Sequence, residues 1–296
     1  MNLCGHEIKT QGRVVRIAAL SADTFEFVDD PEIAIETLRN CGERVDIFTF
    51  MQRLPETERK YSYPMEWDNL AVLPVDTFEH WWNKQIGFKA RNKAKQAEKN
   101  GVEIREVPFC DELVRGIWEI YNESEVRQGK RYPHYGKDLE TVYKMSATFL
   151  DRSVFFGAYL GDRLIGFVKL HCDASRVQAG LTHILSLIEQ RDKAPTNALL
   201  ARSVRYCAEK KIPYLVYSRF SDGKKVRDSL MDFKERNGFG RVNLPRYYVP
   251  LTLVGRIAFR LGLHKRLSDH LPEPIHAKLR ALRKAWYTRK SHPVAE

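Results

Sequence analysis

The order of the elements expected between residues 153 and 250 constrains the fold more than any other feature of this chain. Two runs rich in β-forming residues, 153–160 and 164–171, are separated by Gly161-Asp162-Arg163, which suits the positive φ of a tight hairpin turn. The pattern then predicts a strand, a helix, a strand, a helix and a last strand, at 177–187, 195–208, 214–218, 228–237 and 242–251. This order is typical of a mixed α/β sheet flanked by helices.

Five segments within and just before this region carry a family resemblance. They are Lys89–Val102, Gly157–Gly166, His183-Ile-Leu-Ser186, Pro195–Leu200 and Phe233-Lys-Glu-Arg-Asn-Gly-Phe239. Together they resemble the GNAT acyltransferases, in the branch related to the Fem-type aminoacyl transferases that form peptidoglycan bridges. The resemblance spans residues 76–252. It implies an α/β (α+β) fold with a mixed, mostly antiparallel central sheet flanked by helices, and an acyltransferase activity.

The sequence predicts three parts. Residues 1–75 form a small N-terminal α/β segment, with strand-like runs at 13–19, 45–51 and 70–75 and a helix at 31–40; the Fem-like enzymes have two related halves, so this segment is a possible diverged half-domain. Residues 76–252 form the GNAT-like domain, in which further helices are expected at 78–100, broken near Gly87, at 111–123 and at 138–150. Residues 253–296 form a basic, amphipathic helical tail.

The net charge of +11 is concentrated in two segments. Residues 253–296 hold ten Lys or Arg against three Asp or Glu, and residues 83–101 hold six against one. Focused positive charge attracts anionic partners. In the tail, apolar residues recur at helical spacing: Leu253, Ile257, Leu261, Ile275, Leu279, Leu282 and Trp286. Three interpretations stay open: tail helices that dock on the main domain, an anionic membrane surface, or RNA, with tRNA as the expected form.

Composition also bounds the location and the chemistry. The five cysteines are scattered, with no CxxC pair, which argues against a disulfide scaffold and a zinc site and suits a reducing cytosol. The sequence shows no signal peptide and no run of apolar residues long enough to span a membrane. We therefore expect a cytoplasmic protein, possibly peripheral at the inner membrane surface, with no metal. Serine-elbow, HExxH and dinucleotide-glycine motifs do not occur.

The resemblance implies where the acyl donor binds. In GNAT enzymes, backbone N–H groups of the fourth strand hold the donor carbonyl, and the start of the next helix holds the pyrophosphate of coenzyme A. The matching residues here are Ile184, Leu185, Ser186, Arg191, Lys193, Thr196 and Asn197. The family's Gln/Arg-x-x-Gly-x-Gly/Ala turn lacks both glycines here, and Pro195 removes one N–H. We expect no permanently bound cofactor, acyl-CoA (acetyl-CoA) as the donor, and aminoacyl-tRNA as the alternative.

Three residues are predicted to act in catalysis. His183 lies in mid-strand, where an imidazole can accept the proton of the amine, although a structural histidine fits the same pattern. Phe233 stands where acetyltransferases often have a proton-donating Tyr, and the adjacent Lys234 fits the Phe-Lys pattern of the Fem-like branch, where a lysine stabilises the oxyanion; a solvated helix lysine is the alternative. Tyr217 ends the strand at which GNAT acceptor sites open.

The acceptor is expected to contact a basic, aromatic loop at 127–137 and the end of the strand at 214–218. The candidate contacts are Arg131, Tyr132, His134, Tyr135 and Ser218. The predicted function is an N-acyltransferase that acts on the amine of a sugar, a lipid-linked molecule or a peptide, such as a cell-envelope precursor. Two alternatives remain: a non-catalytic GNAT-fold binding module, or an RNA-binding protein that uses the two basic segments. The sequence does not indicate an oligomeric state.

Overall fold

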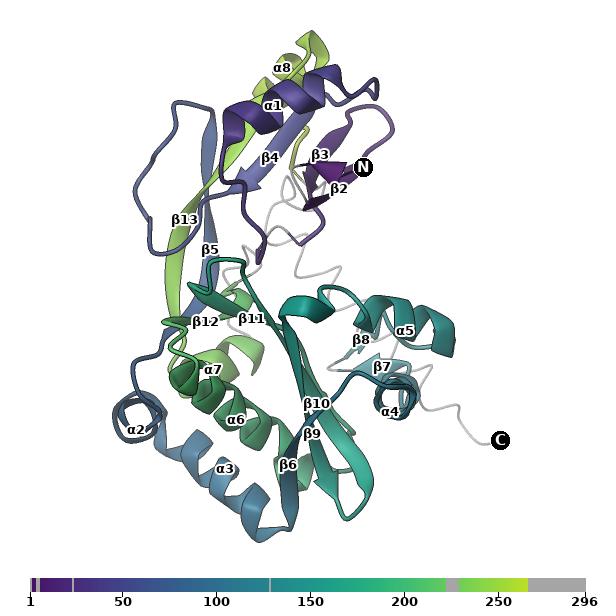
Figure 1. Ribbon diagram of the computed structural model, residues 1–296, viewed down its shortest axis with the longest axis vertical. Coiled ribbons are helices and arrows are strands. Elements are labelled where there is room, and N and C mark those ends of the chain that lie inside the picture. The colour runs from purple at the N-terminus through teal and green to yellow at the C-terminus, as the bar shows by residue number, and fades with distance from the viewer. Residues whose placement is uncertain (1, 4–5, 23, 128, 222–228, 266–296) are drawn as a thin grey trace. The chain divides into compact units, whose positions relative to one another are not determined.

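The computed structural model describes residues 2–3, 6–22, 24–127, 129–221 and 229–265. The fold is mixed α/β, with mostly antiparallel strands flanked by helices (Figure 1). The chain divides into two compact units. Among the described residues, the first unit comprises those up to Asp76, Cys172–Gly180 and those from Lys211 to Lys265, and the second comprises Thr77–His171 and Leu181–Lys210.

The first unit is built on strands in the order β1-β2-β3-β4-β13-β5-β12. Their bounds are β1 Asn2–Leu3, β2 His6–Gln11, β3 Ile17–Leu20, β4 Ile47–Met51, β5 Met65–Pro74, β12 Tyr214–Arg219 and β13 Gly240–Pro250. Neighbouring strands pair antiparallel, except that β3 runs parallel to β4. The first residues of β11 (Gln178–Ser186) pair in parallel with β12. The strands predicted at 45–51, 70–75 and 242–251 are found as β4, β5 and β13, whereas the strand expected at 13–19 begins only at Ile17, as β3, because residues 13–15 form a bend. β2 was not predicted.

The helices of the first unit are α1 (Pro31–Asn40), α7 (Ser229–Arg236) and α8 (Leu253–Arg260). α1 has the predicted bounds because Asp30 caps it, accepting hydrogen bonds from two N–H groups of the first turn, and Pro31 occupies the position where a missing N–H costs nothing. Its buried face packs into a core with residues of β2, β3, β4 and β13.

The second unit contains strands in the order β11-β10-β9-β6. Besides β11, its elements are α2 Phe78–His80, a π-helical turn Trp81–Gln85, α3 Phe88–Lys99, β6 Val102–Val107, α4 Asp111–Asn122, β7 Val126–Arg127, β8 Lys130–Arg131, α5 Leu139–Ser146, β9 Ser153–Leu160, β10 Arg163–Cys172 and α6 Pro195–Glu209. Figure 1 shows α3 and α6 on one face of these strands and α4 and α5 on the other.

Alternation along β9 explains these two layers. The ring of Phe156 packs against Tyr206 of α6, with ring centroids 5.7 Å apart, and lies under the guanidinium of Arg202. Phe155, the residue before it, points to the opposite face of the sheet and stacks on Phe109, which in turn contacts Tyr143 of α5. Successive side chains of a strand point to opposite faces, so adjacent aromatic residues supply both cores.

Several predicted details are confirmed. The β9–β10 hairpin turns at Gly161, whose φ is +61°, and the helical region 78–100 is interrupted at Gly87. The first segment of the first unit ends at Asp76, and residues 240–250 pair with β4 and β5 in that unit. The tail helix expected around Ile275–Trp286 lies outside the described residues. Among those described, no helix is both long and apolar enough to cross a membrane.

Candidate active site

His183 lies on β11 in the second unit, within a cluster of rings. Its Nδ1 is 3.1 Å from the hydroxyl oxygen of Tyr121, and its ring centroid is 6.4 Å from that of Phe167 on β10. His134 approaches to 5.8 Å between centroids. Together with Tyr132, these residues form what we call the aromatic cluster: Tyr121, Tyr132, His134, Phe167 and His183.

The structure brings the predicted acceptor loop onto the predicted base. The ring of His134 stacks on Tyr121, with centroids 4.8 Å apart and planes inclined by 22°, and Tyr132 meets both rings at steeper angles. Nδ1 of His134 is buried and has no hydrogen-bond partner among the described residues. Arg131 and Tyr135 lie in the same loop but are exposed, Arg131 3.5 Å from the carboxylate of Glu125. Tyr132 and His134 of this loop therefore belong to the cluster, whereas Arg131 and Tyr135 are exposed to solvent.

Burial sets the charge state of the cluster. It lowers the pKa of His183 to about 4, with smaller effects from His134, Lys169 and Lys137. Burial, followed by Lys137, also lowers the pKa of His134, and burial raises the pKa of the Tyr121 phenol. Both imidazoles are consequently neutral at neutral pH. When Tyr121 accepts the hydrogen bond from Nδ1–H of His183, Nε2 presents its lone pair and is able to take a proton.

The placement of Tyr121 follows from the pattern of α4. Its buried residues recur at helical spacing: Leu113, Val114, Ile117, Ile120 and Tyr121. Tyr121 is four residues after Ile117 and thus continues the apolar stripe toward the sheet, while its hydroxyl is still able to pair with a polar group. Tyr121 was not singled out from the sequence, so its contact with His183 was missed.

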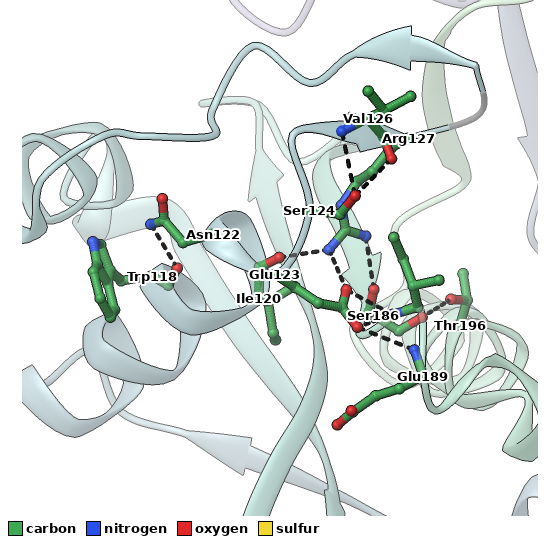
Figure 2. Close-up of polar contacts among 11 residues, drawn as sticks. Trp118, Ile120, Asn122, Glu123, Ser124, Val126, Arg127, Ser186, Glu189 and Thr196 are labelled. Carbon is green, nitrogen blue, oxygen red and sulfur yellow. Dashed lines mark hydrogen bonds and ion pairs between the residues drawn. The ribbon is translucent and has the colours of Figure 1, made fainter. Parts of the chain in front are cut away.

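A second polar centre joins the end of α4 to the loop after β11 (Figure 2). The carboxylate of Glu123 accepts hydrogen bonds from the backbone N–H groups of Ile188, at 2.6 and 2.7 Å, and of Glu189, at 3.0 Å. It also pairs with Nη2 of Arg127 at 2.9 Å, and Nη1 of Arg127 donates to the carbonyl of Ser186 at 2.9 Å. The carboxylate of Glu123 thus binds backbone N–H groups just after β11, the strand that is predicted to hold the acyl donor.

Arg127 links this centre to the acceptor loop. Its guanidinium is almost fully buried and lies 5.1 Å from the ring centroid of Tyr132, close enough for a cation–π contact. Nη2 also donates to the carbonyl of Ile120. The ion pair thus connects α4, β7 and the carbonyl at the end of β11. The Glu123–Arg127 pair has i,i+4 spacing, but the N–H group of Ile188 that Glu123 also binds lies 65 residues away, so the sequence did not predict this centre.

The residues predicted to bind the acyl donor lie around a turn in which several backbone N–H groups already pair with carbonyls. The hydroxyls of Ser186 and Thr196 lie 3.2 Å apart, and Gly166 leaves room for the carbonyl of Leu185, which lies 3.1 Å from where a Cβ would stand. In the turn between β11 and α6, the backbone N–H groups of Arg191, Lys193, Ala194 and Asn197 all donate to nearby carbonyls. Ala194 adopts a left-handed backbone, with φ of +55°. Ile184 is partly buried on β11, Arg191 is exposed, and Lys193 lies 3.5 Å from Asp192.

The other two predicted catalytic residues belong to the first unit. Lys234 is 3% exposed, donates through Nζ to the carbonyl of Arg219 and lies 4.9 Å from the ring centroid of Tyr217. It is therefore not the solvated helix lysine that the sequence left open. Tyr217 packs against Phe233 and Phe239, and burial raises its pKa to about 12, so its phenol stays protonated. The structure thus brings Lys234 and Tyr217 together, in a different unit from His183.

The ladder between β11 and β12 is short. It comprises three residue pairs, from Gln178 with Tyr214 to Gly180 with Val216, and no further pair is present among the described residues. Tyr217 and Ser218 follow directly on β12, and Ser218 has a left-handed backbone with φ of +51°, at a bulge against β5.

Ser218 lines a cavity of about 650 Å³ within the first unit. The cavity is rich in cationic and hydroxyl side chains: Lys9, Arg219, His264, Lys265, Ser21, Thr24, Thr49 and Ser218. The described lining residues include no carboxylate. The hydroxyl of Thr49 is buried without a hydrogen-bond partner among the described residues. Such a lining suits an anionic ligand. The basic loop at 222–227, which follows β12, lies outside the described residues.

Comparisons with known proteins agree on the fold. No family model and no curated protein matches the chain. Among solved structures, FemX superposes with a TM-score of 0.52 at 13% identity, over 78% of this chain and 71% of FemX. L-PGS from Bacillus licheniformis reaches 0.54 at 12% identity, over 86% of this chain and 85% of that one. The chain has a GNAT-like, Fem-related fold. A C-terminal domain from Agrobacterium fabrum, named for lysylphosphatidylglycerol synthetase, matches at 0.53 and 13% identity, over 86% of this chain and 83% of that domain.

Proposed function

We propose that the protein is an N-acyltransferase that moves an acyl or aminoacyl group onto an amine. The observation that carries the proposal is His183, a neutral imidazole on β11 that is hydrogen-bonded to Tyr121 and packed beside the predicted acceptor loop. In the reaction the amine nitrogen attacks the donor carbonyl and His183 takes the amine proton. As the tetrahedral intermediate collapses, the bond to the leaving oxygen or sulfur breaks and the leaving group receives that proton.

The loop geometry favours aminoacyl-tRNA over acyl-CoA as the donor. A coenzyme A pyrophosphate needs several N–H groups at the start of a helix. Here Glu123 accepts from the N–H groups of Ile188 and Glu189, and four N–H groups of the following turn, at 191, 193, 194 and 197, donate to carbonyls. The N–H groups that would bind the pyrophosphate are thus already paired, two of them with the carboxylate of Glu123.

The basic face of α3 supports a nucleic-acid donor. Its alanines at positions 90, 94 and 97 are buried, while Lys89, Lys93, Lys95 and Lys99 are exposed. Because small residues hold the helix against the unit, its long cationic side chains project outward. A row of exposed lysines suits contact with a phosphate backbone.

The cavity of the first unit suits an anionic group, which supports an acceptor that carries phosphate. Lys9, Arg219 and Lys265 line it, of which Arg219 pairs with Asp68 and Lys265 with Glu66, and the buried hydroxyl of Thr49 has a hydrogen bond to give. We infer that the acceptor is a phosphate-bearing, lipid-linked amine such as a cell-envelope precursor. One neighbour, the domain from Agrobacterium fabrum, fits this class of acceptor in name, since it is named for lysylphosphatidylglycerol synthetase.

Donor binding tests the proposal. We expect a mixture of aminoacylated tRNAs to raise the melting temperature of the protein and to bind with a strong salt dependence. Acetyl-CoA at millimolar concentration should give no shift. Stabilisation by acetyl-CoA with none by tRNA would assign a coenzyme A donor instead. If neither binds, the donor assignment fails.

The alternative of a non-catalytic binding module is favoured by the same closed loop. It predicts that the protein binds an anionic amine without forming an amide. Single-turnover incubation with charged tRNA and a lipid extract separates the two, since only an acyltransferase discharges the tRNA into an amide.

A further inference from the structure

α8 presents its large apolar side chains outward. Leu253, Ile257 and Leu261 are 66%, 51% and 64% exposed, and Val254 and Leu263 are exposed as well. The sequence analysis had left open that these residues dock on the main domain. The buried residues of the helix are instead the small ones, Gly255 and Ala258.

The inward face of α8 explains this reversal. A Cβ on Gly255 would stand 1.9 Å from the carbonyl oxygen of Asp46, so the helix lies directly against the backbone before β4. Asp46 also accepts a hydrogen bond from Thr252, whose hydroxyl caps the first turn of α8 at 3.0 Å from the N–H of Gly255. The helix is thus fixed by backbone contact and a cap, and its apolar stripe is not used for packing.

The loop between β2 and β3 joins the same surface. Val14 is 79% exposed, and its carbonyl accepts a hydrogen bond from Arg44, which also pairs with Asp46. Because Asp46 binds Thr252 at the start of α8, Val14 and α8 lie at the same end of the first unit. Figure 1 shows α8 beside α1 at this end.

Exposed cations surround the apolar side chains. They are Arg13, Arg44, Arg256, Arg260 and Lys265. Glu66 pairs with Lys265 at 2.8 Å, and Glu43 is exposed next to Arg44. We call this set, with Val14, Leu253, Val254, Ile257, Leu261 and Leu263, the basic apolar surface. It combines hydrophobic residues with an excess of positive charge.

We propose that the basic apolar surface docks on an anionic lipid bilayer, with the α8 side chains inserted among the headgroups. Apolar residues flanked by cations match the boundary between acyl chains and anionic headgroups. The chain's own residues 266–296 are the other available cover, but they hold seven Lys or Arg against three Asp or Glu. A basic segment does not complement a basic surface, whereas an anionic bilayer does. The proposal extends the proposed function, because it places the enzyme at the surface where a lipid-linked acceptor lies.

Vesicle flotation with the full chain tests this surface. The probes are vesicles of phosphatidylcholine alone and with about 30% phosphatidylglycerol. We expect binding to the anionic vesicles only, weakened by salt. The variant Ile257→Ser/Leu261→Ser should bind at least about tenfold more weakly, and Arg256→Gln/Arg260→Gln about 25-fold more weakly, since each arginine near the surface is worth roughly fivefold. Phe88→Ser is the matched control, because Phe88 is 69% exposed on α3 in the other unit.

Several results would overturn the proposal. Equal binding to neutral vesicles would remove the role of charge, and unchanged binding by both double variants would assign the membrane contact to another part of the chain. A dimer in the wild type that the Ile257→Ser/Leu261→Ser variant dissolves would assign the surface to a second copy of the chain. Circular dichroism confirms folding of each variant. Acyl transfer to a water-soluble amine should be unchanged in the α8 variants. Failure of the protein to bind anionic vesicles would therefore leave the proposed acyltransferase function standing, and absence of acyl transfer would leave the membrane proposal standing.

Discussion

Replacing Glu123 with Ala is expected to destabilise the second unit strongly. The substitution removes the acceptor of two backbone N–H groups and the partner of a guanidinium that is 5% exposed. Each hydrogen bond to a charged group contributes about 1.5–3 kcal/mol, and breaking a buried ion pair from one side costs about 3–5 kcal/mol. These effects overlap, because both count the same carboxylate. We therefore expect a loss of about 3–5 kcal/mol in the free energy of unfolding.

Urea denaturation followed by tryptophan fluorescence measures this loss, and Trp118 reports from the same helix. Glu119→Ala is the matched control, since Glu119 is an exposed residue of α4, and it should change stability by no more than about 0.5 kcal/mol. Adding Arg127→Met to Glu123→Ala should recover about 1–3 kcal/mol by removing the unpaired charge. If Glu123→Ala falls within about 1 kcal/mol of Glu119→Ala, the network does not hold the loop as described.

Three further predictions concern the cluster and α8. Burial lowers the pKa of His183 from 6.5 to about 4, so the unfolded chain binds the proton more tightly than the folded chain. The contribution of His183 to the free energy of unfolding is therefore complete above pH 6.5 and falls by about 2–3 kcal/mol by pH 4.5. This loss should be missing in His183→Phe. Tyr121→Phe should slow turnover about 10–100-fold while unfolding free energy changes by less than about 1.5 kcal/mol; an unchanged kcat would exclude a role for the phenol. Gly255→Ala should cost about 1–3 kcal/mol in urea denaturation, because the added Cβ meets the Asp46 carbonyl, and a neutral effect would contradict the packing of α8.

Local signals predicted most of the elements. The cap at Asp30, the turn at Gly161 and the position of Pro195 fix the ends of α1, β9 and α6 through contacts within a few residues. Such signals depend on backbone preference and on the nearest neighbours, so a single sequence contains them.

The site was predicted only in part, for a physical reason. His183, Tyr132 and His134 were singled out and lie together, but Tyr121, the residue that orients His183, was not. A tyrosine on an apolar helix face shows the same pattern whether or not its hydroxyl meets a partner 62 residues away. The pairing of Glu123 with the loop amides likewise depends on tertiary contact and leaves no periodic signal.

The central claim is that His183 serves as the base of an acyl transfer. The most direct measurement is the rate at which label from aminoacyl-tRNA charged with isotopically labelled amino acids enters an amide, in the presence of a lipid extract. Wild-type protein should form a labelled amide, detected by mass spectrometry, and His183→Gln should form it about 10²–10⁴-fold more slowly with unchanged tRNA binding. An equal rate in the variant, or label recovered only as free amino acid with both proteins, would contradict the account.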